Sequence, residues 1–280
     1  MSTAPRDRPP AARYRLIPAG CLVALVVAQI AYPLTTAAAR DAVTVAVVLL
    51  SAGTALLHAA VTRGVRYGLG FAVIVSGTGL FAEAVGTATG IPFGAYDYAT
   101  GRLGPALFGV PLVVPLAWTG GLYPIWVVAG ILCRRAGPRI LATATGAVGW
   151  DLFLDPQMVA DGQWRWHRAG AGLPGLEAIP WTNYLGWFLV AAVMAAALTL
   201  WDRTAPPAGR VAVPVLMFLW TWLGSALAHA AFLGLPYSAG YGLVALGILG
   251  VPLLVKLVRT GAGRMPGHDR GATGPVVWRG

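Results

Sequence analysis

Charged residues are scarce in this chain. Asp, Glu, Lys and Arg make up 11% of its 280 residues, against about 25% in a typical soluble domain, and this excludes a soluble enzyme and a disordered tail protein. Cysteine is scarce as well: Cys21 and Cys133 are too few for a disulfide framework, and neither has metal-binding spacing. Hydrophobic residues make up 57%, enough for about eight membrane helices of about 20 residues each. The chain is therefore a membrane protein.

Apolar segments long enough to cross a bilayer follow one another along the chain. The predicted spans are 16–36, 42–62, 67–88, 107–133, 139–157, 184–201, 211–234 and 239–258. They predict an all-α, polytopic transmembrane helix bundle that occupies 16–258. The basic ends have no apolar periodicity, so 1–15 is predicted to be a disordered N-terminus and 259–280 a flexible tail.

The 20 basic residues divide unevenly between the two sides of this bundle. One side holds only four of them, Arg40, Arg102, Arg165 and Arg168. Because cytoplasmic loops carry the excess of Lys and Arg, both termini are predicted to be cytoplasmic. The same loops explain the net charge of +10, so nucleic acid is not an expected partner. The first span also resembles a signal peptide, with an alanine triplet at 37–39, but its apolar run is long for one and an uncleaved anchor is preferred.

Five Asp, Glu and His side chains lie within the predicted spans: His58, Glu83, Asp151, Asp155 and His229. Such groups are costly in lipid and usually face a cavity or a partner. The topology places Glu83, Asp151 and His229 at one depth near the outer ends, and His58 near the cytoplasmic end. Asp151 and Asp155 are four residues apart and share a helix face, where two ionised carboxylates would repel unless a proton or a cation compensates. The alternative is structural: a buried His or Glu also hydrogen-bonds a neighbouring helix.

Aromatic residues gather in the loops predicted on the outer side. The third loop carries Tyr96-Asp97-Tyr98, and the fifth carries Trp164 and Trp166. They either belong to the aromatic belt at the membrane interface or form the mouth of a pocket for a long apolar ligand.

Several sequence blocks occur in a distinctive order over 83–187. They are Glu83, then TGIPFGAYDY at 89–98, GVPLVVPLAW at 109–118, DLFLDPQM at 151–158, WRW at 164–166 and IPWTNYLGW at 179–187. In this order and spacing the chain resembles the membrane carotenoid hydratases, which include the γ-carotene and bisanhydrobacterioruberin hydratases. It departs from them at 176–180, where LEAIP stands in place of a Tyr-Tyr-Gly-Ile-Pro-like stretch. This loop is where selectivity for the end group is expected to differ.

The resemblance implies a hydro-lyase without a cofactor, which adds water across the terminal double bond of an acyclic carotenoid ψ-end to give a tertiary alcohol. An acid protonates the alkene and water captures the tertiary cation. Asp151 is expected to be that acid, because burial favours a neutral carboxyl group. Asp155 is expected to stay ionised and orient the water, and Glu83 is able to exchange roles with Asp151. Two further groups of residues complete the predicted site. The rings expected to stabilise the cation are those of Trp118, Trp150, Trp166 and Trp187. The residues expected to bind the substrate are Tyr96, Asp97, Tyr98, Asn183 and His229.

Three other functions stay open. A carotenoid cyclase would form the same cation and capture it with an internal alkene. A prenyl-transfer enzyme would use Asp pairs to hold Mg²⁺ and diphosphate, but the chain has one lysine, Lys256, and no second Asp-rich motif. A lipid or carotenoid transporter would show repeats between its halves, and none is clear. The expected location is the plasma membrane, with an acyclic carotenoid, membrane lipid and other carotenoid-pathway enzymes as partners.

Overall fold

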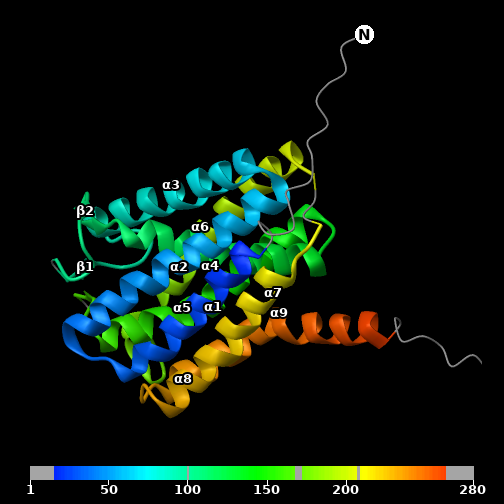
Figure 1. The fold of residues 1–280 in the computed structure, drawn as a ribbon. Coiled ribbons are helices and arrows are strands. Elements are labelled where there is room, and N and C mark those ends of the chain that lie inside the picture. The colour runs from blue at the N-terminus through cyan, green and yellow to red at the C-terminus, as the bar shows by residue number, and fades with distance from the viewer. Residues whose placement is uncertain (1–15, 100, 168–171, 207–208, 263–280) are drawn as a thin grey trace, which may run out of the picture.

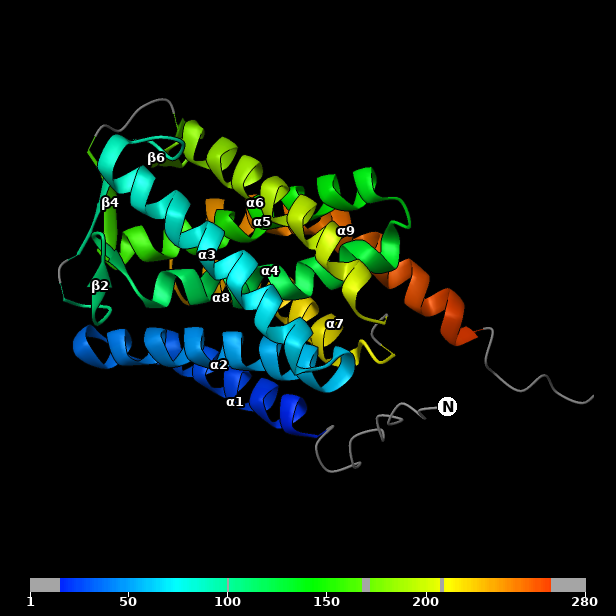
Figure 2. The same cartoon turned by 90° about the horizontal axis from the view of Figure 1, so that it is seen from above.

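The computed structural model describes residues 16–99, 101–167, 172–206 and 209–262. Its helices are α1 (Ile17–Ala31), α2 (Ala37–Arg63), α3 (Val65–Thr89), α4 (Val113–Leu132), α5 (Ala136–Ala160), α6 (Trp181–Trp201), α7 (Ala212–Leu219), α8 (Ser225–Ala231) and α9 (Pro236–Ala262). A 3-10 turn, η2 (Tyr32–Leu34), follows α1, and another, η3 (Asp202–Thr204), follows α6. The π-helical segment η4 (Trp220–Gly224) joins α7 to α8 in one continuous rod. Figure 1 and Figure 2 show these helices packed lengthwise as a bundle, which confirms the predicted all-α architecture.

Each predicted span corresponds to a helix or, for 211–234, to the α7–η4–α8 rod. Within the described residues, seven helices are long and apolar enough to cross a membrane, and α5 is not among them. Asp151 and Asp155 lower the hydropathy of α5, yet both are buried, because α4, α6 and α9 pack around this helix. Contacts with these neighbouring helices therefore keep the two carboxyl groups of α5 away from lipid.

Several predicted boundaries differ from the helix ends, most of all the one before α4. The fourth span was expected to begin at residue 107, but α4 begins at Val113 because the hairpin β2 (Ala106–Leu107) and β3 (Val110–Pro111) precedes it. Its turn needs positive φ at Phe108 (52°) and Gly109 (79°), which a helix does not allow. Helix α9 continues to Ala262, past the predicted end of the last span. The predicted disordered N-terminus at 1–15 and the tail beyond 262 lie outside the described residues.

Two more short antiparallel pairs lie at the same end of the bundle as the β2–β3 hairpin. They are β1 (Tyr96–Tyr98) with β4 (Trp164–Trp166), and β5 (Gly172–Leu173) with β6 (Leu176–Pro180). The β1–β4 pair joins the third predicted loop to the fifth, with Tyr96 opposite Trp166 and Tyr98 opposite Trp164. This pairing closes one end of the bundle over the ends of α3 and α5.

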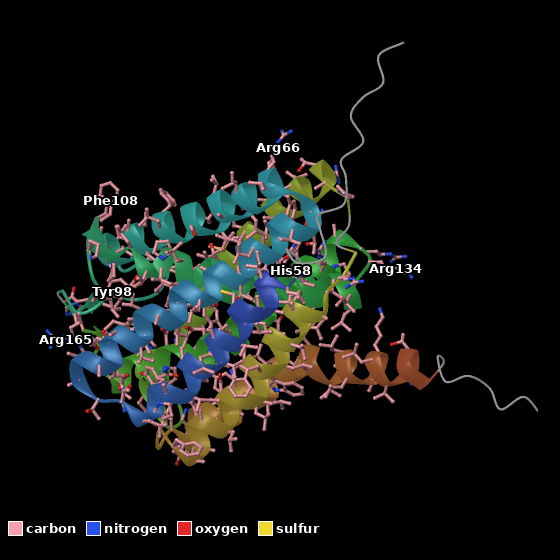
Figure 3. All side chains as sticks on the ribbon, viewed as in Figure 1. His58, Arg66, Tyr98, Phe108, Arg134 and Arg165 are labelled. Atoms are coloured by element: carbon pink, nitrogen blue, oxygen red, sulfur yellow. The ribbon has the colours of Figure 1, made fainter. Side chains whose placement is uncertain are left out.

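Charged side chains mark the two ends of the bundle. In Figure 3, Arg66 and Arg134 lie at the end opposite Tyr98 and Arg165, as the predicted topology requires. At the end that holds Arg66, the carboxylate of Asp202 binds the guanidinium groups of both Arg63 and Arg139. This ion cluster joins the end of α2 and the start of α5 to the turn η3, three segments that are far apart in the chain. The assignment of this end to the cytoplasm remains a prediction.

Candidate functional site

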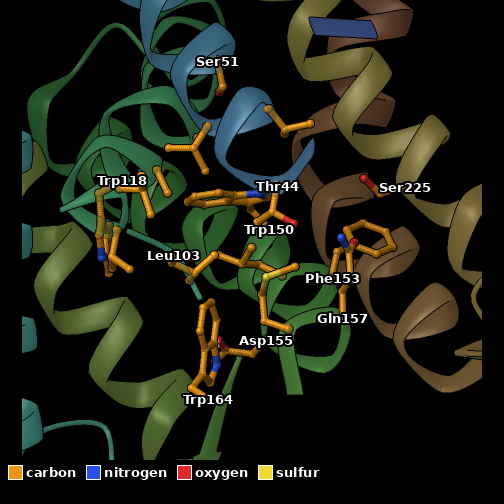
Figure 4. Close-up of a pocket in the computed structure, with 18 of the residues that line it drawn as sticks. Thr44, Ser51, Leu103, Trp118, Trp150, Phe153, Asp155, Gln157, Trp164 and Ser225 are labelled. Carbon is orange, nitrogen blue, oxygen red and sulfur yellow. Dashed lines mark hydrogen bonds between the residues drawn. The ribbon is translucent and has the colours of Figure 1, made fainter. Parts of the chain in front are cut away.

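A cavity of about 150 Å³ lies beneath the β1–β4 sheet, and we call it the first cavity. Its wall is mainly apolar and rich in aromatic rings, with Phe93, Tyr96, Tyr98, Trp118, Trp150, Trp164, Trp166 and Trp187 among the residues that line it. Glu83 and Asp155 are its two acidic lining residues, and no Lys, Arg or His occurs among the described residues of the wall. Figure 4 shows part of this wall, with Asp155 beside Trp164 and the indole of Trp150 across the cavity. The first cavity therefore combines apolar surface with two carboxyl groups.

Glu83 projects from α3 into a set of hydrogen-bond donors. The hydroxyl groups of Tyr96 and Tyr98 both donate to Oε2, the second at 2.8 Å, and Trp118 Nε1 donates to Oε1 at 3.0 Å. Burial and the neighbouring Glu83 carboxylate raise the pKa of Tyr96 and Tyr98 far above the usual range of a phenol. Both hydroxyls therefore keep their protons and serve as donors. Helix α4, strand β1 and helix α3 meet at this one carboxyl group.

Glycines on α3 make room for the groups around Glu83. A Cβ at Gly79 would lie 3.0 Å from Trp118 Cδ1, and one at Gly86 would lie 2.8 Å from Phe93 Cδ2 and 3.1 Å from the Tyr96 hydroxyl. A Cβ at Gly86 would force the Phe93 ring to move, and one at Gly79 would press on the Trp118 ring, so packing favours glycine four residues before and three residues after Glu83.

Asp151 and Asp155 are joined through one amide group. Asn183 Nδ2 on α6 donates to Asp151 Oδ2 at 2.9 Å and to Asp155 Oδ2 at 2.5 Å. Trp164 Nε1 donates to Asp155 Oδ1 at 3.2 Å, whereas Asp151 Oδ1 is buried and has no hydrogen-bond partner among the described residues. Asp155 lines the first cavity, and Asp151 lies behind it, fully buried. The two carboxyl groups share a helix face as predicted, but only one of them faces the cavity.

Three tryptophans predicted around a cation form a connected wall. The rings of Trp118 and Trp187 are stacked, with centroids 3.9 Å apart and an interplanar angle of 19°. Trp150 meets Trp187 edge-on at 5.4 Å. These rings come from α4, α5 and α6, so the aromatic surface depends on the packing of three helices.

The β1–β4 sheet sorts its residues by face. Side chains alternate along a strand, so Tyr96, Tyr98, Trp164 and Trp166 lie on the inner face and line the first cavity. Asp97 lies on the other face, where it is 56% exposed and pairs with His167 Nε2 at 2.8 Å. Asp97 was predicted to bind the substrate, but the structure places it on the face away from the first cavity.

His229 also lies outside the first cavity. Its Nδ1 is 2.8 Å from Ser238 Oγ and its Nε2 is 3.1 Å from Gln157 Oε1. It lines a neighbouring cavity instead. Of the predicted site residues, the structure brings nine to the first cavity: Glu83, Asp155, Asn183, Tyr96, Tyr98, Trp118, Trp150, Trp166 and Trp187.

Trp164 and Gln157 line the first cavity but were not in the predicted site. Trp164 was identifiable in principle, because Trp-x-Trp has the period of a strand and mirrors Tyr-x-Tyr at 96–98. Gln157 follows Asp155 by two residues in a helix, and no pattern in the sequence distinguishes it from a packing residue.

The chain was compared with known proteins. Residues 43–249 match the model of a family described as carotenoid biosynthesis protein. The chain is also similar to the bisanhydrobacterioruberin hydratase of Haloarcula japonica, with 34% identity over 116 residues. That alignment covers 40% of this chain and 38% of the relative, so it spans well under half of either protein. No solved structure matches the chain.

Proposed function

The chain belongs to the family of carotenoid biosynthesis proteins, and from that premise we propose that it adds water across the terminal double bond of an acyclic carotenoid to give a tertiary alcohol. One observation carries the proposal: Glu83 and Asp155, from different helices, face a single cavity whose wall includes five tryptophans and no Lys, Arg or His among its described residues. Hydration of such an alkene needs a proton donor, a wall that tolerates a cation, and a site for water. The first cavity offers a candidate for each.

The proton comes from the pair formed by Asp151 and Asp155. Two carboxyl groups bridged by the one amide of Asn183 are too close for both to ionise in a dry site, so the pair holds one proton. Asp155 delivers it, because Asp155 is the member that lines the cavity. The alkene's π electrons form the new C–H bond at the less substituted carbon, and the adjacent carbon becomes a tertiary cation. This exchanges the roles first expected for Asp151 and Asp155.

Glu83 acts as the anion that offsets this cation. Its oxygens face three donors, Tyr96, Tyr98 and Trp118, and hydrogen bonds to a carboxylate stabilise its charged form. The faces of Trp118, Trp150 and Trp187 add cation–π attraction, worth about 2 kcal/mol when desolvated.

Water is held beside Asn183. The side-chain nitrogen of Asn183 is committed to the two aspartates, and no hydrogen bond to its carbonyl oxygen occurs in the part of the chain that the structure describes. That oxygen accepts one hydrogen of the water while the water oxygen bonds to the cation. The other hydrogen goes to Asp155 as a proton, which restores the starting state of the pair, so the reaction needs no external acid or base.

The competing functions make different demands on the same cavity. Prenyl transfer requires positive groups around diphosphate, and the described residues of the wall include no Lys or Arg. A cyclase would use the same cation but exclude water, so its product has the mass of the substrate. A transporter would leave the substrate unchanged. We place the enzyme in the plasma membrane, with an acyclic carotenoid, membrane lipid and other carotenoid-pathway enzymes as its partners.

Expression in a host that accumulates acyclic carotenoids tests the proposal. We expect a pigment heavier than the substrate by one water per reacted end, with the heavy isotope incorporated when the cells grow in H₂¹⁸O. Host cells with the empty vector are the control. A product of unchanged mass but altered retention would show cyclisation, and an unchanged pigment would refute catalysis on this substrate.

A further inference from the structure

A second cavity, of about 460 Å³, adjoins the first. Five residues line both cavities: Gln29, Tyr32, Val47, Gln157 and Ser225. In Figure 4, Gln157 and Ser225 lie on the side of the first cavity opposite Trp118. The two cavities therefore adjoin along these five side chains, on the side away from Trp118.

The second cavity opens on the flank of the bundle. Its walls are α1 with η2 on one side and η4 with α8 on the other, and Figure 1 shows α1 and α8 at the outside of the bundle. At its mouth, Leu34 is 75% exposed and Leu227 and Phe232 are each 62% exposed. In a membrane protein, apolar side chains exposed on the flank face lipid. The opening therefore leads to the bilayer rather than to water.

Several polar groups inside the second cavity are already paired. Trp220 Nε1 donates to Gln29 Oε1 at 2.8 Å, which ties one wall to the other. His229 lies between Ser238 and Gln157. Groups satisfied in this way impose little desolvation cost on an apolar ligand. Trp220 belongs to the π-helical segment, a geometry that often occurs at functional sites.

The first cavity is too small for a whole carotenoid. An apolar cavity of about 150 Å³ binds a ligand the size of benzene, so the first cavity, with its volume of about 150 Å³, holds one branched end group. The long polyene attached to that end group must leave the first cavity along a connected apolar space. The second cavity, which shares five lining residues with the first, lies where such a continuation is needed.

We propose that the second cavity is the binding groove for the polyene chain of the substrate, and that the substrate enters it sideways from the membrane between α1 and α8. This assignment rests on the proposed function. It gives His229, which does not reach the first cavity, a place in the wall of the groove.

A matched pair of substitutions on α8 tests the groove. Ala228 lines the second cavity, whereas Ala230 is exposed and lines neither cavity. Ala228→Trp places a ring of about 150–250 Å² in the groove, and Ala230→Trp places the same ring toward lipid. Each protein, in native membranes, is given a full-length acyclic carotenoid and a short acyclic isoprenoid with the same terminal double bond. The amount of polyene that copurifies with each protein is measured as well.

In Ala228→Trp, the ratio of long to short substrate converted should fall by about tenfold or more, because the lost apolar contact weakens only the long chain. Polyene occupancy should fall with it, and Ala230→Trp should keep both within about twofold of wild type. Equal losses on both substrates, or unchanged occupancy in Ala228→Trp, would overturn the groove. If wild type binds polyene without hydrating it, and Ala228→Trp lowers that binding, the groove stands and the proposed function fails.

Discussion

Glu83→Gln separates the charge of the site from its shape. In the native protein, Oε2 of Glu83 accepts hydrogen bonds from Tyr96 and Tyr98, and Oε1 accepts one from Trp118 Nε1 at 3.0 Å. A glutamine whose carbonyl oxygen takes the place of Oε2 keeps both tyrosine bonds. Its NH₂ group then faces the indole N–H, so one buried hydrogen bond is lost, at about 1–3 kcal/mol of folding free energy.

The effect of this substitution on turnover should be larger than its effect on folding. A carboxylate about 4 Å from a cation, at an effective dielectric constant of about 20, contributes about 4 kcal/mol of attraction. Loss of that attraction in the transition state corresponds to a decrease of about 10²–10³-fold in rate. We therefore expect Glu83→Gln to be made and inserted, with a modestly lower melting temperature, and to be nearly inactive.

The assay is the amount of hydrated carotenoid formed per amount of folded protein, with folding checked by size exclusion and thermal melting in detergent. Tyr98→Phe is the control, because it removes one hydrogen bond to Glu83 and leaves the negative charge in place. Its loss of turnover should stay within about tenfold. Glu83→Gln turnover above about a tenth of the wild-type value would refute the role of the charge.

Three more substitutions probe the site and its supports. Asp155→Asn removes the proton donor that faces the cavity and should lower hydration by about 10²–10⁴-fold without preventing insertion; wild-type product levels would contradict the assignment. Gly86→Ala should press on the two aromatic rings beside it, destabilise the protein by about 1–3 kcal/mol and reduce product, whereas Gly77→Ala, on the same helix with nothing within 4 Å, should do neither. Equal effects of the two alanines would refute the packing argument. Asp202→Asn leaves two arginines at the opposite end of the bundle without their shared carboxylate and should destabilise the fold by about 3 kcal/mol. The activity of Asp202→Asn per folded molecule should be unchanged. Asp97→Asn, which removes a charge from an exposed pair, is the control and should keep the wild-type melting temperature. Similar melting temperatures for Asp202→Asn and Asp97→Asn would refute the role of the cluster.

Some features of the site were predictable because they depend on residue type within one helix. Glu83 and Asp155 are acidic residues in apolar segments, and such residues usually face a cavity; both do. The common depth of Glu83, Asp151 and His229, which was derived from helix rise and the alternation of spans, stays a prediction. The similarity to carotenoid hydratases, inferred from the blocks between 83 and 187, is confirmed by the family match and by the relative.

Other features depend on contacts between distant segments. Strand β1 binds β4 about 70 residues away in the chain, and only that register shows that Asp97 faces outward while Tyr96 and Tyr98 face Glu83. Likewise, Asp151 and Asp155 occupy the same face of α5, and the position of Asn183 and Trp164 decides which carboxyl group reaches the cavity.

The sequence by itself determined that this chain is a helical membrane protein, where its apolar helices lie to within a few residues, and which acidic residues are costly enough to mark a site. Hydropathy and helix period are local properties, so they can be read residue by residue. The tertiary structure decided which of those residues share a cavity, which aromatic rings surround them, and that α1 and α8 line a second cavity next to the first. Those arrangements arise from the packing of helices and strands far apart in the chain, and no local pattern encodes them.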